Sequence, residues 1–175
     1  MTTTLVLTVI GPDRPGIVER ISQTLVEHQG NWIESRMARL SGQFAGILRV
    51  DLPANRAKDF ESACRGLKAE GLDVLTTFSH EEVRSEVRRM VILEVTGHDR
   101  PGIVRDISRV LAHKDVNVEE LTTGVESAPM SADQLFRATA RLAVPDGITN
   151  EELSGLLEPI GNDLMVDISL APVVS

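Results

Sequence analysis

The sequence predicts an α+β protein made of two βαββαβ units, each an antiparallel sheet with two helices on one face. Two observations carry this prediction. A segment that begins at Gly11 returns at Gly97, and in each copy the apolar residues first alternate as in a strand and then recur at helical spacing. The 175 residues are enough for two small domains. We therefore expect domain 1 at residues 1–80, a linker at 81–89 and domain 2 at 90–175.

The repeat is dense over its first part. Residues 11–18, GPDRPGIV, reappear as GHDRPGIV at 97–104, an offset of 86 positions, and at that offset Asn31 matches Asn117. Farther on, Phe44 matches Phe136 at an offset of 92, so the second copy carries six additional residues. They fall in segment 127–134, whose composition predicts a loop. Segment 81–89, EEVRSEVRR, is charged and is interpreted as the linker, with extension of a flanking strand as the alternative.

The elements follow in the same order in both copies. Alternation predicts first strands at 5–9 and 91–95, and helical spacing starts at Ile17 and Ile103. The strand after Asn31 does not alternate cleanly, but the strand at 44–52 and its counterpart at 136–144 do, and Ser41-Gly42 predicts a hairpin turn. Second helices are predicted at 57–70, capped by Gly71, and at 149–160, capped by Thr149. Last strands at 73–78 and 164–170 complete a ferredoxin-like arrangement.

The composition narrows the functional classes. With 26 acidic and 18 basic side chains the net charge is −8, which disfavours direct DNA binding, and Arg84, Arg88 and Arg89 alternate with acidic residues. No apolar run approaches the roughly 20 residues of a membrane span, and the start of the sequence lacks the basic residues of a signal peptide, so we expect a cytoplasmic protein.

Cys64, the single cysteine, fits a helical core position, with a reactive thiol as the alternative. The pattern predicts neither a metal site nor a cofactor.

The loop Asp13-Arg14-Pro15-Gly16, repeated at 99–102, has the residues of an anion site. Proline presets the backbone for a helix start, and glycine leaves the amides of the first turn approachable. A helix start offers unpaired N–H groups and a partial positive charge, which suit a carboxylate. The alternative is a tight connection between strand and helix without a ligand.

The strand, the loop GxDRPGIV, the amphipathic helix and the following Asn resemble the ACT domain, over nearly the whole chain and twice. This resemblance implies that an amino acid binds at the first loop, at the interface of two paired domains, held by the helix-start amides and by a polar side chain at the Asn position. The implied ligand contacts are Asp13, Gly16, Ile17, Val18, Asn31, Asp99, Gly102, Ile103, Val104 and Asn117. Serine-binding members have a polar residue where this chain has glycine at positions 11 and 97, so serine is not the expected ligand.

Each of these residues also has a structural interpretation. Asn31 and Asn117 tolerate a left-handed turn, Asp13 and Asp99 are suited to cap the helices, and the two arginines of the loops are suited to be solvated.

Two ACT copies occupy nearly the whole sequence, an arrangement that resembles the group of glycine cleavage system transcriptional repressors. The resemblance implies an amino-acid-responsive regulator, with glycine as one candidate ligand, that contacts a DNA-binding transcription activator and does not itself bind nucleic acid or membranes. We do not expect an enzyme, because the four histidines show no catalytic or ligand spacing and fit surface positions. A small ferredoxin-like enzyme and a structural dimerisation module remain the alternatives, and pairing within one chain or in a homodimer stays open.

Overall fold

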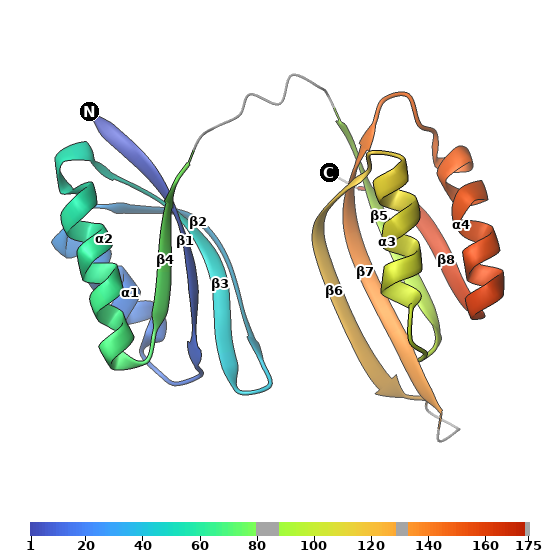
Figure 1. Cartoon of the computed structure of the whole chain (residues 1–175), viewed down its shortest axis with the longest axis horizontal. Helices are drawn as coiled ribbons and strands as arrows, with labels where there is room; N and C mark the ends of the chain where they lie inside the picture. The colour runs from blue at the N-terminus through green and yellow to red at the C-terminus, as the bar shows by residue number, and fades with distance from the viewer. Residues whose placement is uncertain (80–87, 129–132, 174–175) are drawn as a thin grey trace. The chain divides into compact units, whose positions relative to one another are not determined.

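The computed structural model describes residues 1–79, 88–128 and 133–173. The chain forms two compact units, Met1–Glu82 and Val83–Ser175, for which we keep the names domain 1 and domain 2 (Figure 1). Domain 1 contains β1 (Thr2–Pro12), α1 (Ile17–Glu27), β2 (Asn31–Leu40), β3 (Gln43–Pro53), the 3-10 turn Ala54–Arg56, α2 (Ala57–Gly66), the 3-10 turn Leu67–Glu70 and β4 (Asp73–Phe78). Domain 2 contains β5 (Arg88–His98), α3 (Ile103–His113), β6 (Asn117–Ser127), β7 (Gln134–Pro145), α4 (Asn150–Leu164) and β8 (Val166–Pro172).

Each domain is a four-stranded antiparallel sheet with both helices on the same face (Figure 1). The strand orders are β2-β3-β1-β4 and β6-β7-β5-β8, which leaves β2, β4, β6 and β8 at the edges. The predicted fold is confirmed in both copies. Residues 81–87 of the predicted linker and 129–132 of the predicted loop lie outside the described residues, whereas Arg88 and Arg89 extend strand β5.

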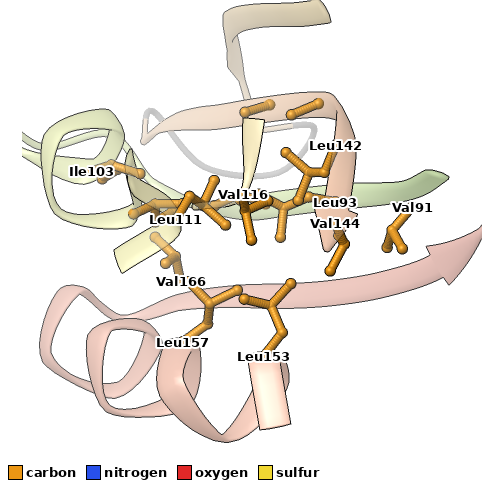
Figure 2. Close-up of a cluster of buried hydrophobic side chains, with 14 of the residues drawn as sticks. Val91, Leu93, Ile103, Leu111, Val116, Leu142, Val144, Leu153, Leu157 and Val166 are labelled. Atoms are coloured by element: carbon orange, nitrogen blue, oxygen red, sulfur yellow. The ribbon is translucent and has the colours of Figure 1, made fainter. Parts of the chain in front are cut away.

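The core of each domain lies between the sheet and its helices. In β1 every second residue is buried, and Leu5, Leu7 and Val9 meet the apolar stripe of α1. Figure 2 shows the equivalent cluster of domain 2, where Leu153 and Leu157 of α4 pack toward the strands. Burying each such side chain stabilises the fold by about 1.5–3 kcal/mol, which is why the alternation fixes which face meets the helices.

Cys64 is a core residue, as its spacing predicted. Its side chain is 2% exposed and belongs to the domain 1 cluster around Phe60. Burial, with a smaller contribution from the nearby Glu61 carboxylate, raises the pKa of the Cys64 thiol to about 12. The thiol therefore stays protonated at neutral pH, and a reactive-thiol role does not fit.

A turn and a bulge account for two features of the sequence of domain 1, the hairpin signal and the imperfect alternation of β2. Ser41 and Gly42 have φ of 49° and 78°, the conformation of a tight hairpin, so the predicted turn between β2 and β3 is confirmed. In β2 the register shifts between Trp32 and Glu34, and this bulge is the reason that the strand does not alternate cleanly.

The second helices differ from prediction at their ends. Gly71 has φ of 85° and caps the 3-10 turn that follows α2, and the Thr149 hydroxyl accepts a hydrogen bond from the Glu152 amide, so both predicted caps are confirmed. The predicted end of α4 at residue 160 is wrong, because the helix passes Pro159 and continues to Leu164. Leu164 packs against the core, and this burial outweighs the missing backbone hydrogen bond of the proline. Among the described helices, none has the length and apolar composition needed to cross a membrane.

The sheet faces that point away from the helices differ between the domains. In domain 1, Thr8 pairs with Ile47 on one side and Leu75 on the other, and these two side chains are 53% and 67% exposed. In domain 2 the equivalent central residue is Glu94, which pairs with Thr139 and Ser169. The outer sheet face of domain 1 therefore carries exposed apolar side chains on both sides of its centre, next to Arg36, where domain 2 has polar side chains.

Candidate functional site

The loop between β1 and α1 is fastened to the rest of domain 1 at two points. The Asp13 amide donates to the Gly42 carbonyl at the tip of the β2–β3 hairpin (2.9 Å), and the Asp13 carboxylate pairs with the Arg39 guanidinium (2.7 Å). Arg14 donates to the Glu70 carbonyl at the end of the second helical segment (2.7 Å). The loop is thus held between the hairpin on one side and the turn before β4 on the other.

Domain 2 repeats this fastening. The Asp99 amide donates to the Gln134 carbonyl (2.9 Å), and the Arg100 guanidinium donates to the Asp163 carbonyl (3.3 Å). The interpretation of the two aspartates as helix caps is wrong, because the N-cap positions are Gly16 and Gly102, each without a side-chain cap. Arg14 is exposed and Arg100 is half-buried, so both are in contact with solvent as interpreted, and each also donates a hydrogen bond that positions the loop.

Gly16 leaves the start of α1 open. Its φ of 90° is left-handed, and a Cβ built there would meet nothing within 4 Å. The first intrahelical hydrogen bond runs from the Arg20 amide to the Gly16 carbonyl (2.9 Å), so the amides of Ile17, Val18 and Glu19 precede it. Those amides can donate hydrogen bonds to a carboxylate, and the positive end of the helix dipole favours its negative charge.

The start of α3 is more crowded. A Cβ on Gly102, where φ is 100°, would lie 3.3 Å from the Arg105 guanidinium and 3.5 Å from the Asp106 carboxylate. Arg105 and Asp106 form an ion pair (2.7 Å), and hydrogen bonding from Arg105 lowers the pKa of the Asp106 carboxyl. A carboxylate is therefore already present at this helix start, whereas the start of α1 has Arg20 at the equivalent position.

The two apolar residues that follow each loop differ in burial, and the difference is the same in both copies. The side chains of Ile17 and Ile103 are 3% and 2% exposed and belong to the cores, so only their backbone amides are accessible to a ligand. Val18 and Val104 are 48% and 42% exposed and face solvent.

Asn31 and Asn117 lie at the opposite end of their sheets from the loops. Asn31 is level with Asp51 of β3, which pairs with Thr4 of β1, eight residues before Pro12. Eight residues of strand span roughly 26 Å. Asn117 has the equivalent position, level with Ala143. Within one domain the structure therefore does not bring the predicted loop contacts and the predicted asparagine together, and a site that contains both requires a second domain beside the first.

The alternative interpretation of the asparagines as left-handed turn residues is wrong. The left-handed residues before β2 and β6 are Gln29, with φ of 59°, and Asp115, with φ of 53°. Asn31 and Asn117 are the first residues of their strands, and both are exposed.

Gly11 and Gly97, where the chain departs from serine-binding members, are required by packing. A Cβ on Gly11 would lie 2.6 Å from the Gly71 carbonyl oxygen, and one on Gly97 would lie 2.7 Å from the Met165 carbonyl oxygen. In each domain the last strand begins so close to the first that no side chain fits there. The departure therefore has a structural reason in this chain.

Sequence reasoning missed a cavity in domain 2. It has a volume of about 150 Å³ and lies between α3 and the sheet, with Val118 and Leu121 of β6 and Phe136 and Ala140 of β7 among its walls. The signal was present in the repeat, because Ala140 stands where domain 1 has the fully buried Leu48.

Arg88 and Arg89 of the basic patch have structural contacts, and of the described histidines His28 is half-buried and not at the surface position expected for it. Arg88 donates to the Asp115 carbonyl (2.6 Å) and pairs with its carboxylate, and Arg89 donates to the Ile148 carbonyl (2.7 Å), so both arginines close loops of domain 2; Arg84 lies outside the described residues. His28 packs edge-on against Phe60 and is half-buried, while His98 and His113 are exposed and His80 lies outside the described residues. Within residues 1–79, 88–128 and 133–173, no group of three or more His, Cys, Asp or Glu side chains is placed to hold a metal ion.

Comparison with known proteins places both domains. Models of the ACT domain match residues 3–79 and residues 91–140. The glycine cleavage system transcriptional repressor of Escherichia coli is 28% identical over 126 residues, which are 71% of this chain and 66% of that protein. A PolC-type DNA polymerase III of Caldanaerobacter subterraneus is 30% identical over 75% of this chain, but the chain spans only 10% of the polymerase.

Two solved structures extend over the whole chain. A protein of unknown function from Galdieria sulphuraria has a TM-score of 0.88 at 35% identity, covering 99% of this chain and 100% of that one. A putative glycine cleavage system transcriptional repressor has the same fold, with a TM-score of 0.73 at 19% identity. The repeated loop, the two βαββαβ domains and these matches agree: the chain belongs to the ACT domain family, of which it carries two copies.

Proposed function

We propose that this chain is an amino-acid-responsive transcriptional regulator of the glycine cleavage system that acts through protein contact and does not bind DNA directly. The observation that carries the proposal is the repeated loop, which in both copies is fastened at its Asp amide and Arg side chain and ends in an uncapped helix start. Because the fastening groups bond back to the domain, the amides at the start of α1 remain for a ligand carboxylate, while at the start of α3 the nearby Asp106 carboxylate is paired with Arg105.

The proposed site joins two domains. The loop contacts Asp13, Gly16, Ile17 and Val18, or their counterparts Asp99, Gly102, Ile103 and Val104, come from one domain, and Asn31 or Asn117 comes from another that lies beside it. Pairing within one chain and pairing between chains both satisfy this requirement. The exposed edge strands β2 and β6, which begin with the asparagines, are suited to such pairing.

Charge and surface support a protein partner. A net charge of −8 favours a basic partner, and DNA-binding activators are basic where they meet DNA. The outer sheet face of domain 1, with Ile47 and Leu75, is an exposed apolar surface of the kind that marks contact sites. We propose this face for the contact with the activator and the cytoplasm as the location of the protein.

The ligand is tested by titrating the full chain with glycine and the other amino acids while following Trp32 fluorescence and the thermal midpoint. A ligand at about a hundred times its Kd stabilises the native state by about 2.7 kcal/mol, which is several degrees for domains of this size. We expect Asn31→Ala or Asn117→Ala to abolish the response and Asn55→Ala, an exposed site on a 3-10 turn, to leave it unchanged. Absence of any saturable response to an amino acid would reject the sensor.

The contact is tested with a purified DNA-binding activator of the glycine cleavage genes. We expect Ile47→Lys to weaken binding and Thr139→Lys, at the equivalent position of domain 2, to leave it unchanged. In a mobility assay without the activator we expect no binding to duplex DNA, and a steep salt-dependent shift would overturn the regulatory mechanism proposed here.

The exposed edge strands also favour a second candidate, a structural dimerisation module. A stable dimer that responds to no amino acid would support that function instead. Catalysis is not proposed, because the carboxylates of Asp13 at the first loop and Asp106 at the start of α3 are held in ion pairs with Arg39 and Arg105.

A further inference from the structure

The cavity of domain 2 is apolar on almost all sides. Its walls come from α3 and from strands β5, β6 and β7, and Ser108 supplies the single polar side chain among the residues that line it. The bottom is formed by core residues, of which Leu93, Ile103 and Leu111 appear in Figure 2. An unpaired charge or amide inside such walls would lose its hydration without replacement, so the cavity suits a hydrocarbon group.

Domain 1 has larger side chains at three inward positions of β2 and β3, and smaller ones, Ser35 and Gly46, where domain 2 has Leu121 and Ala138. Trp32, Met37 and Leu48 pack in or against its core, whereas domain 2 has Val118, Thr123 and Ala140 there. Leu121, which pairs with Ala140, does not make up the difference, because its side chain is 48% exposed. The two copies therefore share a backbone and a loop but differ in whether the space under the first helix is filled.

The size of the cavity limits the group that fills it. A volume of about 150 Å³ is the size of an apolar protein cavity that accepts benzene. A branched chain of four carbons is of this size, while the hydrogen of glycine leaves the space empty. An unfilled apolar cavity is unfavourable, so a ligand that fills it stabilises domain 2.

The cavity also lies next to the proposed carboxylate site. The cavity is lined by Ile103 and Val104, whose amides are the first of helix α3. Phe136 also lines the cavity and pairs with Gly97, so this part of the cavity lies near the loop. The Asp106 carboxylate at this helix start is paired with the Arg105 guanidinium, so the Ile103 and Val104 amides stay available to a ligand carboxylate. An amino acid bound there is positioned to extend its side chain into the cavity.

We propose that domain 2 binds an amino acid with a branched aliphatic side chain, which occupies this cavity, so that leucine is a better ligand for domain 2 than glycine. This inference rests on the proposed amino-acid site and adds its selectivity. Domain 1, in which the space is filled, does not share this preference.

The test is calorimetric titration of the full chain with leucine, alanine and glycine. We expect leucine to bind domain 2 at least about tenfold more tightly than alanine, because one methylene in an apolar pocket changes affinity by about tenfold or more. Ala140→Leu restores the residue of domain 1 and fills the cavity, and we expect it to weaken leucine binding by at least about tenfold. Thr139→Leu adds the same side chain to the neighbouring residue, which points to the opposite sheet face and is exposed, and is the matched control.

A second variant guards against misfolding of Ala140→Leu. Val118→Trp places a tryptophan at an exposed position that is equivalent to Trp32 of domain 1, and the fluorescence that it adds to that of Trp32 reports on domain 2. Leucine binding that is lost in every cavity variant that folds and kept in Thr139→Leu supports the inference. Equal leucine binding by the wild type and a folded cavity variant overturns it.

The remaining outcomes separate this inference from the proposed function. If glycine or a polar amino acid binds and leucine does not, the selectivity is wrong while the sensor stands. If no amino acid binds the wild type, the sensor itself is wrong and the cavity assignment falls with it.

Discussion

Two glycines, one in strand β1 and one in the loop that follows it, should destabilise domain 1 for different reasons when each is replaced by alanine. Gly16 has a left-handed φ of 90° but open space around it, whereas Gly11 lies in strand β1 with the Gly71 carbonyl oxygen 2.6 Å from the position of a Cβ. Gly16→Ala therefore strains the backbone without a clash, and Gly11→Ala produces a clash without requiring an unusual backbone.

The expected losses in the free energy of unfolding follow from these geometries. A left-handed conformation costs an L-residue about 1–2 kcal/mol, which is the expected loss for Gly16→Ala. For Gly11→Ala the facing atoms are the backbone oxygen of Gly71, which has no side-chain rotation to escape by, and the Leu72 Cδ2 at 2.8 Å. Overpacking of this kind costs about 1–3 kcal/mol and occasionally more.

The two mechanisms are distinguished by asparagine. Asparagine enters the left-handed region more readily than alanine, so Gly16→Asn should destabilise less than Gly16→Ala. At Gly11 the larger side chain deepens the clash, so Gly11→Asn should destabilise more than Gly11→Ala. The order of the two substitutions should reverse between the two positions.

Trp32 is the single tryptophan of the chain and packs against the domain 1 core, so its fluorescence during urea unfolding reports on the affected domain. In thermal unfolding each kcal/mol corresponds to about 4–8 °C for a domain of this size. The same order of Ala and Asn at both positions would refute the reasoning, as would a Gly16→Ala variant as stable as the wild type.

Three further predictions concern single contacts. Cys64 should resist a thiol-specific reagent in the native state and react on unfolding, because it is buried and its pKa is raised to about 12; rapid native labelling would contradict its core position. Hydrogen bonding from Arg20 lowers the pKa of Glu70 below its usual 4.5, so the pair stabilises domain 1 above that pH and the stabilisation is lost as the pH falls through the lowered value. Acid titrations of stability should thus be shallower for Glu70→Gln than for the wild type, and equal slopes would reject this role. Thr149→Ala should destabilise domain 2 by about 1 kcal/mol through loss of the α4 cap, measured by amide exchange in α4, and unchanged exchange would show that the cap is dispensable.

Much of the fold could be predicted because local signals agreed with burial. The alternation through Leu5, Leu7 and Val9 and the hairpin at Ser41-Gly42 are short-range properties that the sequence displays directly. The end of α4 could not be predicted, because Pro159 is a local stop signal that packing of Leu164 overrides, and packing is a property of the folded domain.

The candidate site was predictable in its residues but not in its arrangement. The repeat identified Gly16 and Asn31, yet only the strand register shows that they lie at opposite ends of one sheet. The role of Gly11 depended on its distance to Gly71, sixty residues later in the chain, and a distance of that kind is not encoded by any local pattern.

Two hydrogen bonds connect the loop to parts of domain 1 that are distant in the sequence, the hairpin tip and the turn before β4. A ligand that displaces the loop at Gly16 either breaks the hydrogen bonds of Asp13 to Gly42 and of Arg14 to Glu70, or carries the hairpin tip and the turn before β4 along with it. Strand β3 of the hairpin bears Ile47, and strand β4, which follows the turn, bears Leu75. Both hydrogen bonds therefore lead to strands with exposed apolar residues on the outer sheet face. A ligand that displaced the helix start would in this way change the spacing between residues on the other side of the sheet.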